Sequence, residues 1–170
     1  MEKINVCTAQ HGYEVLIGHG LLKEAGRLSG DGAGKKAAIV TDSKVGPLYA
    51  EPLDTALRDA GWATCLFVFR QGERSKNMNT LGRLLEFLAA NRLTRTDTVF
   101  ALGGGVTGDL AGFAASVYLR GIPCVQLPTT LLAAIDSSIG GKTAVNLRAG
   151  KNLAGTFWQP ERVICDCDTF

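Results

Sequence analysis

Residues 100–121, FALGGGVTGDLAGFAASVYLRG, decide the fold class. An apolar run comes first, and then Gly103, Gly105 and Gly108 satisfy the pattern G-x-G-x-x-G just before a segment with helical character. In a strand–turn–helix unit, such glycines let backbone N–H groups approach a phosphate, and the helix N-terminus adds a favourable partial charge. A tight strand–helix turn without a ligand fits the same pattern. The stretch therefore predicts an α/β unit and leaves its ligand open.

The rest of the chain alternates between expected strands and helices. Strands are predicted at 3–9, 13–18, 36–42, 63–69, 98–102 and 123–127, with a tight turn at His11-Gly12, and helices at 46–61, 77–93 and 129–135. This alternation predicts an α/β, Rossmann-like fold, in which helices flank both faces of a mostly parallel sheet. Residues 140–160 are rich in glycine and lack periodicity, so we expect irregular loops that face a ligand.

Composition excludes several classes of protein. The chain has 170 residues, 46% of them hydrophobic and 20% charged, as expected for one globular domain with its own core. A net charge of +2 from scattered basic residues gives no reason to expect nucleic acid, and no apolar run is long enough to cross a membrane. Five cysteines without a Cys-x-x-Cys pair favour reduced thiols in a cytoplasmic protein.

The dinucleotide pattern has one irregular feature. An acid that holds the ribose is expected about 20 residues after the glycines, at the end of the next strand, and none stands there. Asp42 ends an earlier strand and could serve if the strand order places it beside the glycine turn. Asp109 lies in the first turn of the helix, where it would repel a pyrophosphate. We therefore expect it to meet a ribose, a nicotinamide amide or a structural donor.

A second glycine-rich stretch, DSSIGGKT at 136–143, differs from a P-loop by one residue. Asp136 stands where that motif needs glycine, and the following residues lack the helical periodicity that a P-loop requires. The region instead collects polar residues among small ones: Arg120, Asp136, Lys142, Asn146, Lys151 and Asn152. Cations set among glycines favour a site for an anionic ligand.

Three motifs make the chain similar to the 3-dehydroquinate synthases. They are GGGVTGDLAGFAASVYLRGI, QLPTTLLAAIDSSIGGKTAVN and GKNLAGTFWQP, and QGERSK at 71–76 is in register with them. The resemblance runs from about Asp42 to the end of the chain. It implies an NAD-dependent lyase of the shikimate pathway that converts 3-deoxy-D-arabino-heptulosonate 7-phosphate into 3-dehydroquinate and phosphate. In such a reaction a temporary ketone serves as the electron sink for elimination, and a divalent metal polarises the oxygens.

The resemblance also implies a role for each matched residue. The residues expected to contact NAD are Asp42, Glu73, Lys76, Gly105, Val106, Thr107, Gly108, Asp109, Thr129, Thr130, Lys142 and Lys151. Those expected on the sugar phosphate side, where catalysis occurs, are Arg120, Asp136, Lys142 and Asn152. Arg120 would reach the site of a neighbouring subunit, so the resemblance implies a homodimer.

The resemblance further implies that a second half is missing. Family members are about twice as long, and their helical C-terminal domain supplies a glutamate and two histidines to Zn or Co. We therefore interpret residues 1–170 as the NAD-binding N-terminal domain, without the metal site and inactive alone. His11, His19 and the CDCD stretch at 165–168 are not expected to bind metal. A stand-alone nucleotide-binding module, a subunit paired with a metal-bearing chain, another sugar phosphate cyclase and a small-alcohol dehydrogenase remain alternatives.

Overall fold

A seven-stranded sheet forms the centre of the molecule in the computed structural model, which describes residues 1–8 and 12–170. Its strands are β1 (Glu2–Cys7), β2 (Gly12–Gly18), β3 (Lys36–Asp42), β4 (Ala63–Phe69), β5 (Thr98–Gly103), β6 (Cys124–Pro128) and β9 (Arg162–Asp166). Their order is β1-β2-β9-β6-β5-β3-β4, and only β1 and β2 pair antiparallel. The predicted mostly parallel sheet is confirmed. The expected turn at His11 lies outside the described residues.

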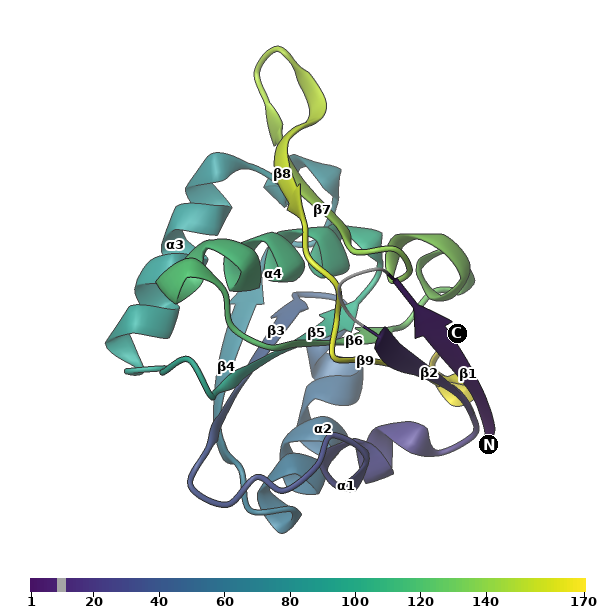
Figure 1. The fold of residues 1–170 in the computed structure, drawn as a ribbon. Coiled ribbons are helices and arrows are strands. Elements are labelled where there is room, and N and C mark those ends of the chain that lie inside the picture. The colour runs from purple at the N-terminus through teal and green to yellow at the C-terminus, as the bar shows by residue number, and fades with distance from the viewer. Residues whose placement is uncertain (9–11) are drawn as a thin grey trace.

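Helices cover both faces of this sheet, as the sequence predicts (Figure 1). α1 (Ala25–Leu28) and α2 (Gly46–Asp59) lie on one face, and α3 (Met78–Ala90) and α4 (Gly105–Val117) on the other. Two of the predicted helices, 46–61 and 77–93, thus end slightly earlier than expected. Within the described residues, no helix has the length and apolar character needed to span a bilayer.

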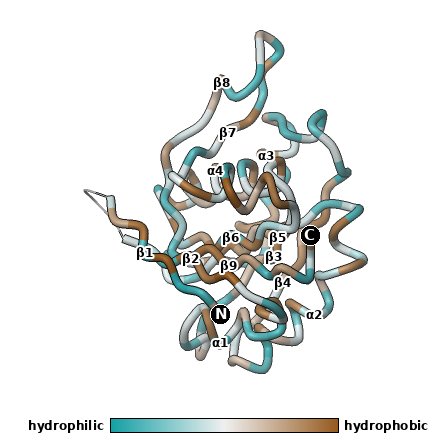
Figure 2. Tube along the Cα trace, turned by 90° about the vertical axis from the view of Figure 1, so that its right-hand side faces the viewer, coloured by the Kyte–Doolittle hydropathy of each residue, from teal (hydrophilic) through white to brown (hydrophobic). Residues whose placement is uncertain are grey.

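The core divides into two layers because side chains alternate across each strand. In β5, Val99 and Ala101 pack in the cluster that holds Leu84 and Leu110, whereas Phe100 and Leu102 pack in the cluster with α1 and α2. All of these side chains are buried. Figure 2 shows the hydrophobic residues gathered in the strands of the central layer. All six residues of β5 are buried, as expected for a parallel strand at the centre of a sheet that is covered on both faces.

The expectation of irregular loops at 140–160 is wrong. β7 (Lys142–Leu147) and β8 (Gly150–Phe157) form an antiparallel hairpin that projects beyond α4 (Figure 1). β8 is exposed along most of its length, so its sequence carries no inside–outside alternation that could have predicted a strand. The register of the hairpin shifts between Val145 and Leu147, where Asn146 lies opposite residues 151–153, which form a bulge in β8.

The segment after Pro128 also differs from the prediction. The sequence predicts a helix at 129–135, and helical residues run from 131 to 137, so the helix is confirmed but shifted by two residues; its last five residues, Ala133–Ser137, form a π-helical turn. The Thr130 hydroxyl accepts a hydrogen bond from the Ala133 N–H (3.2 Å), which places Thr130 at the start of this helical segment. The turn carries Asp136 toward the hairpin.

Candidate functional site

The glycine turn between β5 and α4 has an open helix N-terminus. Gly104 precedes α4 in an extended conformation, and no side chain caps the helix. Three hydroxyls around this turn, those of Thr107, Thr129 and Ser137, are buried without a hydrogen-bond partner. A methyl group on Gly105 would lie 3.0 Å from the Ser137 Oγ. Because buried polar groups are normally paired, the turn is suited to a ligand that supplies acceptors, such as a phosphate.

Asp42 lies beside this turn because of the strand order. β3 and β5 are neighbours, and Thr41 pairs with Leu102, so the carboxyl ends of the two strands meet at one edge of the sheet. The Asp42 Oδ1 accepts hydrogen bonds from the backbone N–H groups of Lys44 (2.8 Å) and Val45 (3.0 Å). These bonds hold the turn into α2 and do not use Oδ2. The condition that the sequence placed on Asp42, adjacency to the glycine turn, is met.

Lys76 joins three elements that are distant in sequence. Its Nζ donates to the Asp109 Oδ2 (2.8 Å) on α4 and to the Asn152 Oδ1 (2.7 Å) on β8, and it lies 3.6 Å from the Glu73 Oε1. Lys76 is only 5% exposed. Its partner Asp109 is also largely buried, and burial raises the pKa of that carboxyl although the Lys76 hydrogen bond opposes the shift. Asp109 therefore has the structural donor that was one of its three expected partners.

Glu73 and Asn146 form the second contact between the same loop and the hairpin. The Asn146 Nδ2 donates to the Glu73 Oε1 (2.7 Å), and the Asn146 Oδ1 accepts from the Asn152 backbone N–H (2.9 Å). The Asn146 hydrogen bond lowers the pKa of Glu73, and the nearby positive charges of Lys76 and Lys151 act in the same direction. Glu73 is thus held as a carboxylate at the edge of the cluster.

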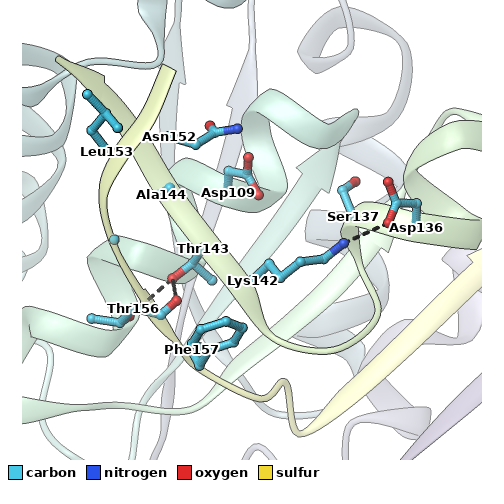
Figure 3. Close-up of a pocket in the computed structure, with 11 residues that line it drawn as sticks. Asp109, Asp136, Ser137, Lys142, Thr143, Ala144, Asn152, Leu153, Thr156 and Phe157 are labelled. Atoms are coloured by element: carbon cyan, nitrogen blue, oxygen red, sulfur yellow. Dashed lines mark hydrogen bonds and ion pairs between the residues drawn. The ribbon is translucent and has the colours of Figure 1, made fainter. Parts of the chain in front are cut away.

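A cleft of about 460 Å³ opens between α4, the π-helical turn and the hairpin (Figure 3). Asp109, Asp136, Lys142 and Asn152 line it, and the Lys142 Nζ lies 2.7 Å from the Asp136 Oδ1. Both side chains of this pair are more than half exposed. The hydrogen bond with Asp136 raises the pKa of Lys142. The cleft therefore offers the charged ammonium of Lys142 to an anionic ligand. That ammonium is paired with the Asp136 carboxylate, which the ligand would displace.

The remaining predicted residues are spread around this cleft or away from it. Lys151 is exposed at the start of β8, and Val106 packs partly against the core. Gly108 faces the sheet, where a methyl group would lie 2.8 Å from the Gln126 Oε1, so this glycine allows close packing. Arg120 is exposed beyond the C-terminal end of α4, with a left-handed backbone (φ 67°). The structure does not bring Arg120 into the cleft of its own chain.

Some residues of the site had no assigned role in the sequence. The sequence predicts no function for Ser137, which lies in DSSIGGKT, and it indicates Asn146 only as a member of the polar cluster. Thr143 and Thr156 also line the cleft, and the Thr143 Oγ1 donates to the Thr156 carbonyl (2.8 Å) across the hairpin. Nothing in the local sequence signals these contacts, because they depend on the hairpin itself.

Among residues 1–8 and 12–170, no three His, Cys, Asp or Glu side chains are grouped so that they could hold a metal ion. His19 is exposed, and its Nδ1 lies 2.6 Å from the Asp168 Oδ1. β9 ends at Asp166, whose carboxylate accepts from the backbone N–H groups of Gly20 (3.0 Å) and Leu22 (2.8 Å). These carboxylates join the end of β9 to the segment that follows β2. We assign no metal ligand to them.

Comparison with known proteins agrees with this fold. The family described as "3-dehydroquinate synthase N-terminal" matches residues 66–170. The chain is 49% identical over 169 residues to a 3-dehydroquinate synthase of Neisseria meningitidis serogroup C, a match that covers 99% of this chain and 47% of that protein. The chain thus spans about half the length of the curated relatives it matches.

Solved structures of similar fold include two sugar phosphate cyclases at 30% identity or more, and dehydrogenases under 25% identity share the fold alone. A 2-deoxy-scyllo-inosose synthase, complexed with carbaglucose-6-phosphate, NAD+ and Co2+, superposes with a TM-score of 0.93 at 30% identity, covering 99% of this chain and 46% of that one. The 2-epi-5-epi-valiolone synthase ValA of Streptomyces hygroscopicus subsp. jinggangensis, with NAD+ and Zn2+ bound, gives 0.83 at 34% identity, covering 95% and 44%.

The fold thus defines an α/β protein of the kind found in one half of these solved synthases. The chain belongs to the 3-dehydroquinate synthase family, and it corresponds to the N-terminal part of that family's proteins.

Proposed function

We propose that this chain is the NAD-binding N-terminal domain of a 3-dehydroquinate synthase. The whole protein would convert 3-deoxy-D-arabino-heptulosonate 7-phosphate into 3-dehydroquinate and phosphate. One observation carries the proposal: in a chain of this family, the strand order places Asp42 beside a glycine turn whose surrounding hydroxyls are buried and unpaired. A ribose acid next to a phosphate cradle is the arrangement that an adenine dinucleotide requires.

The described residues fit NAD in three parts. Asp42 would accept hydrogen bonds from the adenosine ribose, and the N-terminus of α4, with Thr107 and Thr129, would bind the diphosphate. Lys76 and Asp109 would orient the far end of the cofactor at the mouth of the cleft. When bound, NAD supplies a reversible oxidation of a ring hydroxyl, which makes the neighbouring C–H acidic. The protein's task is then to fix the sugar against the cofactor and to receive the released phosphate.

The sugar phosphate would bind on the hairpin side of the cleft. Lys142 presents a cation there, and Asp136 and Asn152 offer an acceptor and an amide to hydroxyl groups. Arg120 lies outside this cleft, so its role depends on the homodimer that the resemblance implies, in which it would act in the partner's site. Sedimentation of the chain at increasing concentration tests that dimer.

The metal, Zn or Co, belongs in this proposal to the part of the protein that these residues do not include. Relatives of about twice the length have room for a second half. The surface beside the cleft suits such a partner, because Leu131, Leu132, Ile135, Leu153 and Phe157 are exposed there. We expect residues 1–170 alone to turn over no substrate. Release of phosphate from the heptulosonate phosphate with NAD+ and Zn2+ or Co2+ would contradict this.

Calorimetric titration with NAD+ tests the cofactor proposal through Asp42. Replacing Asp42 with Ala removes both the ribose acceptor and the backbone contacts at Lys44 and Val45, whereas Asp42→Asn keeps an oxygen for those contacts. Loss of hydrogen bonds to a charged group predicts about 10-fold weaker binding or more in both variants. Binding that weakens only in Asp42→Ala would show that the residue acts through the turn. No binding by the folded wild-type chain would refute the proposal.

Another sugar phosphate cyclase is the second candidate, since the TM-score of 0.93 belongs to a synthase of that wider class. The identity of 49% to a 3-dehydroquinate synthase, against 30% to the inosose synthase, favours the first candidate. A full-length protein assayed with both classes of sugar phosphate decides between them.

A further inference from the structure

One of the contacts between the β7–β8 hairpin and the loop that precedes α3 is made by a side chain that no functional role yet explains. Asn146 lies where the strands leave their regular register, opposite the bulge that residues 151–153 form in β8. Its backbone N–H donates to the Lys76 carbonyl (2.9 Å), so the two elements are joined at the backbone as well. A bulge of this kind frees a residue from strand pairing and directs it elsewhere.

The Asn146 side chain bonds to one partner at each end. Its amide nitrogen donates to the Glu73 carboxylate, and its amide oxygen accepts from the Asn152 N–H. Rotating the amide by half a turn would place a donor against the Asn152 N–H and an acceptor against the carboxylate. The orientation of this amide is therefore determined by the two partners.

Asn152 needs this support. Its backbone is left-handed (φ 57°), a conformation that asparagine tolerates better than most residues but that still requires stabilisation. The bond from Asn146 holds the Asn152 backbone there, and the Asn152 side chain then accepts from Lys76. Asn146 thus acts on Asn152, Glu73 and the loop of Lys76 at once, without lining the cleft itself.

We propose that Asn146 is the positioning residue that ties the hairpin to the Glu73–Lys76 loop and so preorganises the cleft for its dinucleotide. The ligand part of this inference rests on the proposed function. The tether itself is a property of the free chain. Without it, Glu73 loses its amide donor and the Asn152 N–H loses its acceptor, so both residues must be ordered further when the ligand binds, and that ordering lowers the affinity.

The substitution Asn146→Asp isolates the contact. It keeps the size of the side chain and an oxygen for the Asn152 N–H, but it puts a second carboxylate against Glu73. We expect about 10-fold weaker binding of NAD+. Adding Glu73→Gln supplies an amide donor to the new carboxylate, which restores the hydrogen bond with its direction reversed. Together with wild type and Glu73→Gln alone, these variants form a double-mutant cycle.

Two measurements on the 170-residue chain test the proposal, namely calorimetry with NAD+ and amide hydrogen exchange of residues 142–157 without ligand. We expect Asn146→Asp to weaken binding and speed exchange in the hairpin, and the double variant to recover the slow exchange to within about 3-fold of wild type. Equal binding and exchange in wild type and Asn146→Asp would overturn the proposal. So would a double variant whose hairpin exchanges as fast as that of the single one, because a purely structural loss is not repaired by a change at Glu73.

Failure of the proposed function gives a different result. If the folded wild-type chain does not bind NAD+, calorimetry detects no binding for any variant. Hydrogen exchange alone then tests whether Asn146 tethers the hairpin. Faster hairpin exchange in Asn146→Asp, with recovery in the double variant, then supports the tether. Unchanged exchange overturns it. Should Asn146→Asp fail to fold, Asn146→Ser replaces it, since it removes the donor to Glu73 without adding charge.

Discussion

The central sheet and the β7–β8 hairpin are stabilised in opposite ways. β5 is buried along its full length between two apolar layers, whereas β8 is exposed at most positions and ends with Phe157, which is 80% exposed. The hairpin buries Val145 of β7 against the layer of α4, and its exposed remainder is positioned by polar contacts to Lys76 and Glu73 and by close glycine packing. The difference indicates that the stability of the fold and the geometry of the cleft can be changed separately.

Substitution in the sheet gives the largest expected effect. Phe100 is fully buried and packs edge-on against Trp62, with ring centroids 5.5 Å apart. Phe100→Ala removes this side chain and leaves a cavity, so we expect the free energy of unfolding to fall by about 4 kcal/mol. Urea unfolding followed by tryptophan fluorescence measures it. Phe157→Ala is the matched control and should change the free energy by less than about 0.5 kcal/mol. Similar losses in both variants would abolish the contrast.

The second effect tests whether the polar junction also contributes to stability. Lys76→Met leaves the largely buried Asp109 carboxylate without its ammonium, and we expect a loss of about 3 kcal/mol at pH 7. Burial already raises the pKa of Asp109 above the ordinary 3.8, and removing Lys76 raises it further. A raised carboxyl pKa favours folding when the group is protonated, so stability falls as the pH rises through the range above 3.8. The free energy of unfolding that Lys76→Met loses should therefore be smaller near pH 4 than at pH 7.

Urea midpoints at pH 4 and pH 7 give this measurement. Lys142→Met is the control, because the Lys142–Asp136 pair is exposed and such pairs contribute little to stability. A penalty for Lys76→Met that is equal at both pH values would show that Asp109 does not carry it. NAD+ binding should weaken in both lysine variants for different reasons, through the arrangement of the cleft at Lys76 and through direct contact at Lys142.

The third prediction concerns Gly155→Ala, a substitution that should disrupt the pairing of β7 with β8 and leave the central sheet intact. A methyl group on Gly155 would lie 2.0 Å from the Thr143 carbonyl oxygen, which is backbone and has no room to move within the pair. We expect Gly155→Ala to separate β7 from β8 and to cost about 2 kcal/mol. Hydrogen exchange should rise in residues 142–157 and stay unchanged in β3, β5 and β6. Loss of protection throughout the sheet would mean that the two regions unfold together.

The same contrast explains which parts of the structure could be predicted from the sequence. β3 and β5 are short, largely apolar runs that end at an acid and at a glycine, because a strand buried on both faces must be mostly apolar. The amphipathic helix α3 shows its buried leucines at helical spacing. The hairpin shows neither pattern, since β8 has no buried face, and its residues appeared irregular for that reason.

The candidate site was predictable only in part, for a related reason. The missing ribose acid pointed to Asp42 and the polar cluster to Lys142 and Asn152, the family resemblance gave each a role, and the strand order then placed Asp42 beside the glycine turn. The contacts of Lys76 were not predictable, because its partners Asp109 and Asn152 come from other elements and no local spacing connects them. The role proposed for Asn146 likewise appears only once the hairpin bulge is seen.

The smallest expected effect comes from a helix on the sheet side of the comparison. Gly82 lies on the exposed face of α3, and a methyl group there would meet no atom within 4 Å. Alanine loses less backbone entropy than glycine on forming a helix, so Gly82→Ala should raise the free energy of unfolding by about 0.5–1 kcal/mol. Hairpin exchange and the affinity for NAD+ should stay at their wild-type values, because α3 contacts the junction only near its start. A change in either would mean that strengthening the helical layer alters the cleft, and the two regions would then be coupled through α3 rather than through Lys76 and Asn146.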